Sequence, residues 1–292
     1  MGRFSEDFRE KAGKGDAKRD AGLTTPDDIE RFDNISYGTI EPKWQMLDVY
    51  RPKNREMKKL PVIMSIHGGG WVYGDKDVYQ WYCMSLAQRG FAVVNYSYRL
   101  APEYKYPASF EDTSTVAEWI MTHAEQYGFD TEHIFGVGDS AGAHMLSLFA
   151  AAITNPEYHA DFTLPKGFSF QAIALNCGAY KMKYSEAEDN DMNPMKEFLP
   201  DGGTQKELRQ ISSADHITDQ FPPSFVMTCP KDFLSAAPED LIPVLKENCV
   251  PFIYRVYGNK QNPLGHVFHC NIKTSDAKLC NDEECNFFKE FC

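Results

Sequence analysis

The sequence predicts an α/β fold in which a mostly parallel central sheet carries helices on both faces. Apolar runs of strand length alternate with helix-like segments along most of the chain. Several of these runs are continuously apolar, which is typical of strands that are buried on both faces. Because 292 residues suit one domain, we expect a single domain over 1–292, with an N-terminal arm over 1–33 and a small cap or lid over 177–221.

The first third of the chain is expected to begin with the polar arm and to continue into the sheet. Pro26, followed by acidic residues, predicts a short helix over 26–32, because proline favours the first helical turn. Further elements follow in order: strands at 35–40, 44–50, 60–66 and 91–96, and a helix over 77–89 that ends at Gly90.

The remaining two thirds continue the alternation. The expected helices cover 109–127, a segment from Ser140, a segment from about Pro238 and the C-terminal end, and the expected strands cover 134–137, 168–175, 223–228 and 252–257. The interval 177–221 breaks this rhythm, because it is polar and carries a turn signal at 201–203. A long excursion without a role is uncommon in a compact domain, so we interpret this interval as a cap.

A lone serine lies between two glycines in the pentapeptide GDSAG, residues 138–142. The pentapeptide connects the short apolar strand 134–137 to a long segment of helix formers. A serine at such a sharp turn is exposed to substrate, and the flanking glycines let neighbouring segments approach closely. An ordinary glycine-rich turn is the other reading of the same pattern. We predict that Ser140 is a nucleophile, provided that the rest of the chain supplies its partners.

Three consecutive glycines at 68–70 follow the buried strand 60–66. They could form a flexible loop, or backbone that must come close to a ligand and direct its N–H groups at it. The loop leaves the carboxyl end of an inner strand, where parallel sheets build their sites, and this favours the second reading. We expect the N–H groups of Gly69 and Gly70, with that of Ala141, to bind the oxyanion formed when Ser140 attacks a carbonyl group.

A serine needs a general base, and His266 is the histidine that best fits the expected topology. It lies in the loop after the last predicted strand and before the C-terminal helix, and His269 is the alternative in the same region. His67 opens the glycine loop and is better placed to shape it. His144 lies on the helix after Ser140, where packing beside the site is the simpler role.

The acid that orients this base is expected after the preceding strand, and Asp232 occupies that place. Its other reading is a helix N-cap. Asp240 is the alternative, but it falls inside the following helix and would point away from the strand ends. The chain order Ser140, Asp232, His266 is the order expected of a hydrolase triad whose serine lies in a GxSxG elbow.

Composition limits the partners. A formal net charge of −12 argues against nucleic acid or an anionic membrane, because a polyanion would be repelled. No segment has the pattern of a signal peptide or the length of a membrane span, so we expect a cytoplasmic protein. The oligomeric state is not predicted.

The cysteines do not indicate a metal site. The sequence contains eight, and those that crowd the C-terminus form no CxxC pair: Cys280, Cys285 and Cys292. In a chain of this length, dispersed cysteines are expected to be reduced thiols. We therefore expect neither a metal nor a cofactor. We also do not expect His266, His269 and Cys270 to act as metal ligands.

The chain resembles the α/β-hydrolase superfamily and, within it, the hormone-sensitive-lipase-like carboxylesterases and acetylesterases. The resemblance covers about residues 44–292 and rests on HGGGW at 67–71, YRLAPE at 98–103, YPA at 106–108, GDSAG at 138–142, Asp232 and Gly265-His266. It implies that Ser140, Asp232 and His266 form the triad and that Gly69, Gly70 and Ala141 form the oxyanion hole. The chain departs from the family at Ala143, where another glycine is common, and at Phe233, where the acid is more commonly followed by proline.

This resemblance implies a metal-free serine carboxylesterase that acts on small-molecule esters through an acyl-enzyme. Short acyl chains are expected rather than long triglyceride chains, and sugar acetyl or feruloyl esters are compatible. Two alternatives remain: an amidase or peptidase that uses the same triad, and a ligand-binding protein that has lost turnover on a hydrolase scaffold.

Overall fold

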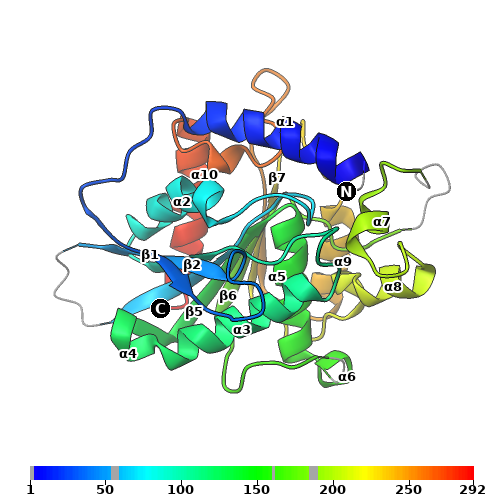
Figure 1. Ribbon diagram of the computed structural model, residues 1–292, viewed down its shortest axis with the longest axis horizontal. Helices are drawn as coiled ribbons and strands as arrows, with labels where there is room; N and C mark the ends of the chain where they lie inside the picture. Colours follow the sequence, from blue (N-terminus) through cyan, green and yellow to red (C-terminus); the bar gives the residue numbers. More distant parts are fainter. Residues whose placement is uncertain (1–2, 54–58, 160–161, 184–189) are drawn as a thin grey trace.

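The computed structural model describes residues 3–53, 59–159, 162–183 and 190–292, and confirms the α/β prediction (Figure 1). Within this part of the chain, eight strands form one sheet in the order β1-β2-β4-β3-β5-β6-β7-β8. The strands are β1 (Ile29–Ser36), β2 (Met46–Pro52), β3 (Leu60–Ile66), β4 (Ala92–Tyr96), β5 (Phe129–Asp139), β6 (Ala172–Asn176), β7 (Ser224–Thr228) and β8 (Phe252–Val256). β2 runs antiparallel to both of its neighbours, and the strands from β4 to β8 in this order are parallel.

The register of the parallel strands aligns their carboxyl ends. Ile66 pairs with Gly138, Asp139 with Asn176, and Thr228 with Val256. The loops that follow β3, β5, β6, β7 and β8 therefore leave the same edge of the sheet. Every residue that the sequence predicts to act in catalysis lies at this edge.

Helices cover both faces of the sheet, and each face has its own apolar core. Side chains alternate along β3, so that Val62 and Met64 pack on one face and Ile63 packs on the other. The first face is covered by α3 (Ala108–Thr122), α5 (Ala141–Thr154) and α9 (Pro238–Glu247). The second is covered by α2 (Lys76–Ala87) and α10 (Ser275–Lys289). Short helices α4 (Ala124–Tyr127) and α6 (Pro156–His159) complete this part of the fold.

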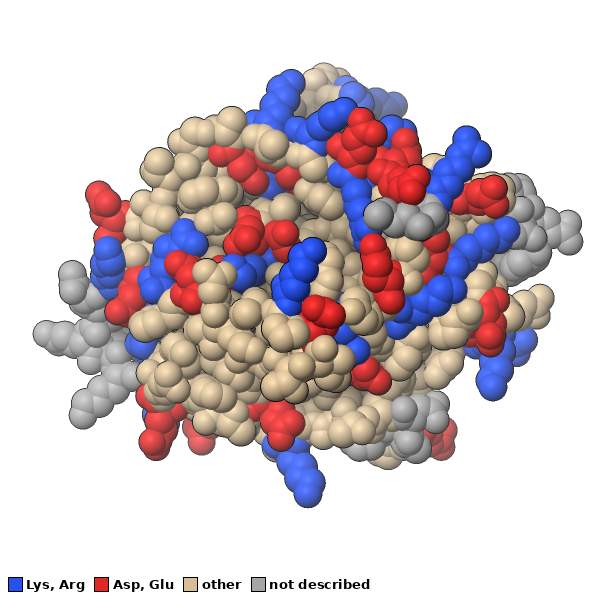
Figure 2. All heavy atoms as spheres, in the orientation of Figure 1, with Lys and Arg blue, Asp and Glu red and all other residues tan. Residues whose placement is uncertain are grey.

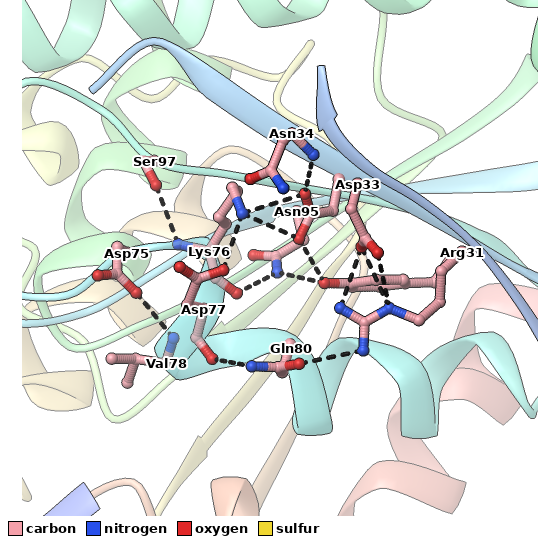
Figure 3. A network of polar contacts seen from close by, with 12 residues as sticks. Arg31, Asp33, Asn34, Asp75, Lys76, Asp77, Val78, Gln80, Asn95 and Ser97 are labelled. Carbon is pink, nitrogen blue, oxygen red and sulfur yellow. Dashed lines mark hydrogen bonds and ion pairs between the residues drawn. The ribbon is translucent and has the colours of Figure 1, made fainter. Parts of the chain in front are cut away.

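A buried polar network fixes the start of α2 against the sheet (Figure 3). Asp75 caps the helix by accepting a hydrogen bond from the N–H of Val78 at 2.8 Å. The Lys76 ammonium lies 3.2 Å from the Asp48 carboxylate of β2, and Asn95 of β4 donates to the Lys76 carbonyl at 2.7 Å. Lys76 also pairs with Asp77 at 2.8 Å. Among the described residues, removing Lys76 would therefore leave the buried Asp48 carboxylate without its cationic partner. The network holds α2 in one register on β2 and β4.

The predicted helix over 26–32 is wrong, because residues 29–36 form β1 instead. Proline does start a turn here, since the Ile29 N–H donates to the Pro26 carbonyl at 3.1 Å. The chain then pairs antiparallel with β2. Pairing along this edge satisfies the backbone groups of β1 and buries Ile29 against the core, which overrides the local helix signal.

The polar N-terminal arm contains a helix, α1 (Arg3–Asp20), which lies along the top of the molecule in Figure 1. Its first N–H groups are capped from a distant segment: the Glu197 carboxylate accepts hydrogen bonds from Phe4 at 2.9 Å and from Ser5 at 3.1 Å. Further along the helix, Arg9 forms an ion pair with Glu103 at 2.7 Å. These contacts anchor α1 to two separate parts of the chain.

Glu197 belongs to the interval 177–221, of which residues 184–189 lie outside the described part. The interval contains α7 (Pro194–Phe198), α8 (Gln205–Gln210) and the 3₁₀ turn η2 (Ser213–Asp215). Both α7 and α8 have side-chain N-caps, from Asn193 and from Thr204. These caps and the contact with α1 show that the described part of the interval is ordered against the domain.

Basic and acidic side chains are interspersed over the face of the molecule shown in Figure 2. On α1, Lys11 pairs with Asp7 at 2.7 Å, and Lys14 pairs with Glu10 at 2.5 Å. The basic residues near the N-terminus are therefore partly neutralised by acids one helical turn away. None of the helices in the described ranges has both the length and the apolar character needed to cross a membrane.

Candidate active site

Ser140 lies at a sharp turn between β5 and α5. Its backbone angles are φ 52° and ψ −119°, a conformation that a residue with a side chain rarely adopts. Two hydrogen bonds hold it there: the Ser140 N–H donates to the Asn176 carbonyl at 2.9 Å, and the Ser140 carbonyl accepts from the His144 N–H at 3.1 Å. The serine is thus presented at the carboxyl edge of the sheet and remains partly exposed.

Steric crowding requires glycine at both glycine positions of the pentapeptide. A Cβ on Gly138 would lie 2.5 Å from the carbonyl oxygen of Gly142, and a Cβ on Gly142 would overlap the carbonyl oxygen of Ile66. Both contacts are with backbone, which cannot move aside as a flexible side chain would. The turn therefore brings α5 directly against the end of β3, where the glycine loop begins.

Asp232 and His266, which are 34 residues apart, lie side by side. The His266 Nδ1 atom is 2.6 Å from the Asp232 Oδ1 atom. Asp232 also accepts hydrogen bonds from the Leu234 N–H at 2.8 Å and from the Thr228 hydroxyl at 2.9 Å. Burial by itself would raise the pKa of Asp232, but the hydrogen bond and charge of His266, with the Leu234 N–H and the Cys177 thiol, outweigh it and lower this pKa. The carboxylate is thus ionised and oriented toward the imidazole.

Backbone contacts between two loops set this distance. The Lys231 N–H donates to the Leu264 carbonyl at 2.9 Å, and Lys231 and Gly265 form a parallel bridge that extends the pairing of β7 and β8. The Cys229 thiol donates to the Gly265 carbonyl at 3.0 Å. The acid loop and the histidine loop are therefore joined immediately before Asp232 and His266.

The alternative base, His269, and the alternative acid, Asp240, have other partners. His269 is buried against the Tyr82 ring, and burial lowers its pKa to about 3. Asp240 forms an ion pair with Lys183 at 2.8 Å on α9. The geometry brings together His266 and Asp232 and not these alternatives.

His67 and His144, the other two histidines considered for the site, have structural partners. His67 is buried, stacks on Tyr98 with ring centroids 4.0 Å apart, and its Nδ1 atom is 2.7 Å from the Gly68 carbonyl. His144 accepts at Nδ1 from the Trp71 indole N–H at 3.2 Å, so its Nε2–H donates to the Ile211 carbonyl at 2.7 Å. Burial lowers the pKa of both imidazoles to about 4. Each therefore stays neutral and supports a loop beside the site.

The glycine loop adopts conformations that glycine allows. Gly69 has φ 122° and Gly70 has φ 59°, and a Cβ on Gly69 would overlap the Tyr73 carbonyl. The Gly69 carbonyl is held by the N–H groups of Val72 and Tyr73 at 3.1 and 3.0 Å. Over the described ranges, the structure records no acceptor for the N–H groups of Gly69, Gly70 or Ala141. These donors are available to a ligand.

Sequence reasoning missed the carboxylate that connects the glycine loop to the serine turn. Asp139, next to Ser140, accepts a hydrogen bond from the Tyr79 hydroxyl at 2.8 Å and one from the Gly68 N–H at 3.2 Å. Burial raises the pKa of Asp139 to about 6, although these hydrogen bonds oppose the effect. The position beside Ser140 was visible in the sequence, but the contact with Tyr79 on α2 was not.

Two groups of metal-binding side chains occur among the described residues: Asp139 with His269 and Cys270, and Cys177 with Asp232 and His266. In the first group the Asp139 oxygens already bond Tyr79 and Gly68. In the second, Asp232 and His266 bond each other. We assign a metal to neither group. All eight cysteines are free, and Cys280 and Cys285 are buried thiols of α10.

Strand order, serine elbow and acid–histidine pair together define the chain as an α/β-hydrolase. The BD-FAE family model matches residues 47–237, which include β3 to β7 and two of the three residues discussed as a triad. The chain belongs to the BD-FAE family.

Several relatives of the chain are named as esterases. The chain is 26% identical over 196 residues to esterase LipC of Mycobacterium tuberculosis, covering 64% of this chain and 48% of LipC. The chain spans about half the length of the curated relatives it matches. The crystal structure of esterase B from Lactobacillus rhamnosis has a TM-score of 0.88 and 25% identity, covering 98% of this chain and 93% of that one. A second structure of esterase B, inhibited by a C4-C4 tributyrin phosphonate, has a TM-score of 0.90 and 26% identity.

Proposed function

We propose that the protein is a serine carboxylesterase that hydrolyses short-chain acyl esters. The observation that carries this proposal is the 2.6 Å contact between His266 and Asp232, at the same sheet edge as the strained turn of Ser140. The relatives support it, because LipC and esterase B are both named as esterases. Esterase B has been solved in a form inhibited by a C4-C4 tributyrin phosphonate and in a C6-C4 inhibited form, which is consistent with short acyl groups.

The proposed reaction proceeds through an acyl-enzyme. His266 takes the proton of Ser140 while the Ser140 Oγ atom forms a bond to the ester carbonyl carbon. The tetrahedral intermediate collapses, the bond to the alcohol oxygen breaks, and His266 returns the proton to the leaving alcohol. Water then attacks the acyl-enzyme by the same path and releases the acid. Asp232 accepts the Nδ1–H of His266, so the Nε2 atom is the one that exchanges protons.

The N–H groups of Gly69, Gly70 and Ala141 are proposed to bind the oxyanion of both tetrahedral intermediates. They suit this role because no described residue accepts a hydrogen bond from them, and the N-terminus of a helix favours negative charge. Losing one such donor typically costs about 3 kcal/mol of transition-state stabilisation.

We further propose that α1 and the interval 177–221 form a cap over this edge of the sheet, as expected of residues 1–33 and 177–221. A Cβ on Gly70 would lie 3.4 Å from the Phe4 ring and 3.6 Å from the Phe8 ring. Both rings come from α1, and α7 holds the start of that helix through Glu197. The cap would limit the room for long acyl chains, while sugar acetyl and feruloyl esters remain compatible substrates.

A p-nitrophenyl ester series from acetyl to palmitoyl tests the proposal. We expect turnover to be highest with acetyl or butyryl esters and to fall with longer chains. Ser140→Ala should abolish turnover while leaving the fold intact, because the side chain is partly exposed. Equal turnover in the variant, or none in the wild type on any ester, would refute the esterase. Turnover of the matching anilides at comparable rates would favour an amidase.

A further inference from the structure

Phe233 is an exposed aromatic side chain in contact with the histidine of the site. It is 74% exposed, and its ring lies over the imidazole of His266 with the centroids 4.2 Å apart and the planes tilted by 43°. It directly follows Asp232 in the chain. The exposed surface of this apolar ring therefore lies beside the imidazole, where a ligand can contact it.

The backbone around Phe233 is fixed. The Leu234 N–H donates to the Asp232 Oδ1 atom at 2.8 Å, and the Ser235 N–H donates to the Asp232 carbonyl at 3.1 Å. These bonds close a tight turn around the acid, with Phe233 at its outer side. The ring is therefore held by a loop that cannot move without disturbing the bond between Asp232 and His266.

The proposed reaction determines which part of an ester would meet this ring. The alcohol oxygen must take a proton from His266, so the alcohol lies beside the imidazole when the ester bond breaks. The carbonyl oxygen is held on the other side, by Gly69, Gly70 and Ala141. A ring that covers the imidazole and has a free face is thus next to the alcohol and not next to the acyl chain.

We propose that Phe233 is a specificity-determining residue that contacts the alcohol part of the ester and selects aromatic alcohols. The inference rests on the proposed esterase function and deepens it by naming the class of leaving group. A phenyl or substituted phenyl group can stack on the exposed ring in an offset or edge-to-face arrangement and shield its apolar surface from water. A small aliphatic alcohol such as ethanol covers little of this surface.

The test compares kcat/KM for phenyl acetate and ethyl acetate in the wild type and in Phe233→Ala. Both esters form the same acetyl-enzyme, so kcat/KM reports acylation, the step in which the alcohol is still bound. We expect Phe233→Ala to lose about three- to tenfold on phenyl acetate and less than about twofold on ethyl acetate. Phe233→Tyr keeps the ring and should retain the selectivity.

If Phe233 acted only by positioning His266, its substitution would change the two kcat/KM values in a different way. Ethoxide is a far poorer leaving group than phenolate, whose conjugate acid has a pKa near 10 like tyrosine, so a misplaced imidazole would harm ethyl acetate at least as much as phenyl acetate. Equal losses on the two esters, or a larger loss on ethyl acetate, would overturn the proposal. Unchanged kcat/KM on both esters would overturn it as well.

Controls separate this proposal from the esterase function and from folding. Leu279→Ala changes another exposed apolar side chain, 51% exposed on α10, and should leave both kcat/KM values unchanged. If the wild type hydrolyses neither ester, or Ser140→Ala hydrolyses both as well as the wild type, the esterase function itself fails. If Ser140→Ala is inactive and Phe233→Ala shows no selectivity change, only the role of Phe233 fails.

Discussion

The Tyr79 hydroxyl donates a hydrogen bond to the Asp139 carboxylate at 2.8 Å, which connects α2 to the residue that precedes the proposed nucleophile. The same carboxylate accepts from the Gly68 N–H, and the Gly68 N–H also lies 3.0 Å from the Tyr79 oxygen. Three segments far apart in the sequence therefore meet at one buried acid. The position of the glycine loop relative to Ser140 depends on this contact.

We predict that Asp139 makes the stability of the protein depend on pH. Its pKa is raised by burial from 3.8 to about 6, so the folded state holds its proton more tightly than the unfolded chain. The resulting stabilisation is complete below about pH 4 and is lost as the pH rises to about 6, a change of roughly 3 kcal/mol. Asp139→Asn, which cannot ionise, should lack this component.

Urea unfolding of the wild type and Asp139→Asn between pH 4 and pH 7 measures the effect. The difference in unfolding free energy between the two proteins should shift by about 3 kcal/mol in favour of the variant as the pH rises. Glu284, whose pKa burial raises to about 7, is present in both proteins, so its contribution largely cancels. Parallel stability profiles would show that Asp139 has an ordinary pKa.

Asp232→Asn should impair catalysis much more than binding. The asparagine amide can donate to His266 and favour the wrong tautomer, so we expect kcat/KM to fall about 10³- to 10⁴-fold with little change in KM. Asp240→Asn is the matched control, because Asp240 pairs with Lys183 and not with His266. A large loss of kcat/KM in Asp240→Asn, with full activity in Asp232→Asn, would show that Asp240 and not Asp232 is the acid.

Much of the sheet could be predicted because its signals are local. The apolar run 60–66 coincides with β3 (Leu60–Ile66), and the turn at 138–142 lies between β5 and α5 as expected. β1 was assigned wrongly, since its pairing with β2 depends on an edge that only the folded sheet provides. The helical form of α1 was missed for a similar reason, because the residue that caps it, Glu197, is about 190 positions away.

The candidate site likewise has features that local sequence predicts and features that depend on long-range contacts. The placement of Ser140, Asp232 and His266 at one edge of the sheet could be predicted from chain order, because each follows a strand whose carboxyl end lies there, and their role as a triad stays a prediction. The 2.6 Å contact between Asp232 and His266 is accompanied by a bridge between Lys231 and Gly265 that no local pattern indicates. The bond between Tyr79 and Asp139 joins positions 60 residues apart through the docking of α2, and the ring of Phe233 carries no sequence signal except its departure from the family.

Gly142→Ala should damage the serine turn. The added Cβ would overlap the Ile66 carbonyl and come within 2.7 Å of the His67 backbone, so α5 or the end of β3 must shift. We expect a loss of about 1–3 kcal/mol in unfolding free energy, as at other overpacked sites, and a loss of activity. Gly15→Ala on α1 is the control: its Cβ would meet nothing within 4 Å, and it should stabilise the helix by about 0.5–1 kcal/mol. Thermal or urea unfolding of both variants measures these changes in stability. An unchanged stability of Gly142→Ala would contradict the close approach of α5 to β3.

Glu197→Ala should loosen α1 without unfolding the domain. Two N–H groups at the start of α1, those of Phe4 and Ser5, would lose the carboxylate that accepts their hydrogen bonds, and the helix dipole would lose a nearby negative charge. We expect α1 to be destabilised by about 1–2 kcal/mol, which corresponds to roughly 5- to 30-fold faster amide hydrogen exchange in this helix. Exchange in α10 should stay the same, because that helix packs on the opposite core cluster from α7. Glu10→Ala, which removes an exposed partner of Lys14 on the same helix, should change exchange in α1 much less. Equal effects of the two substitutions would mean that the contact with α7 does not hold α1 in place over the glycine loop.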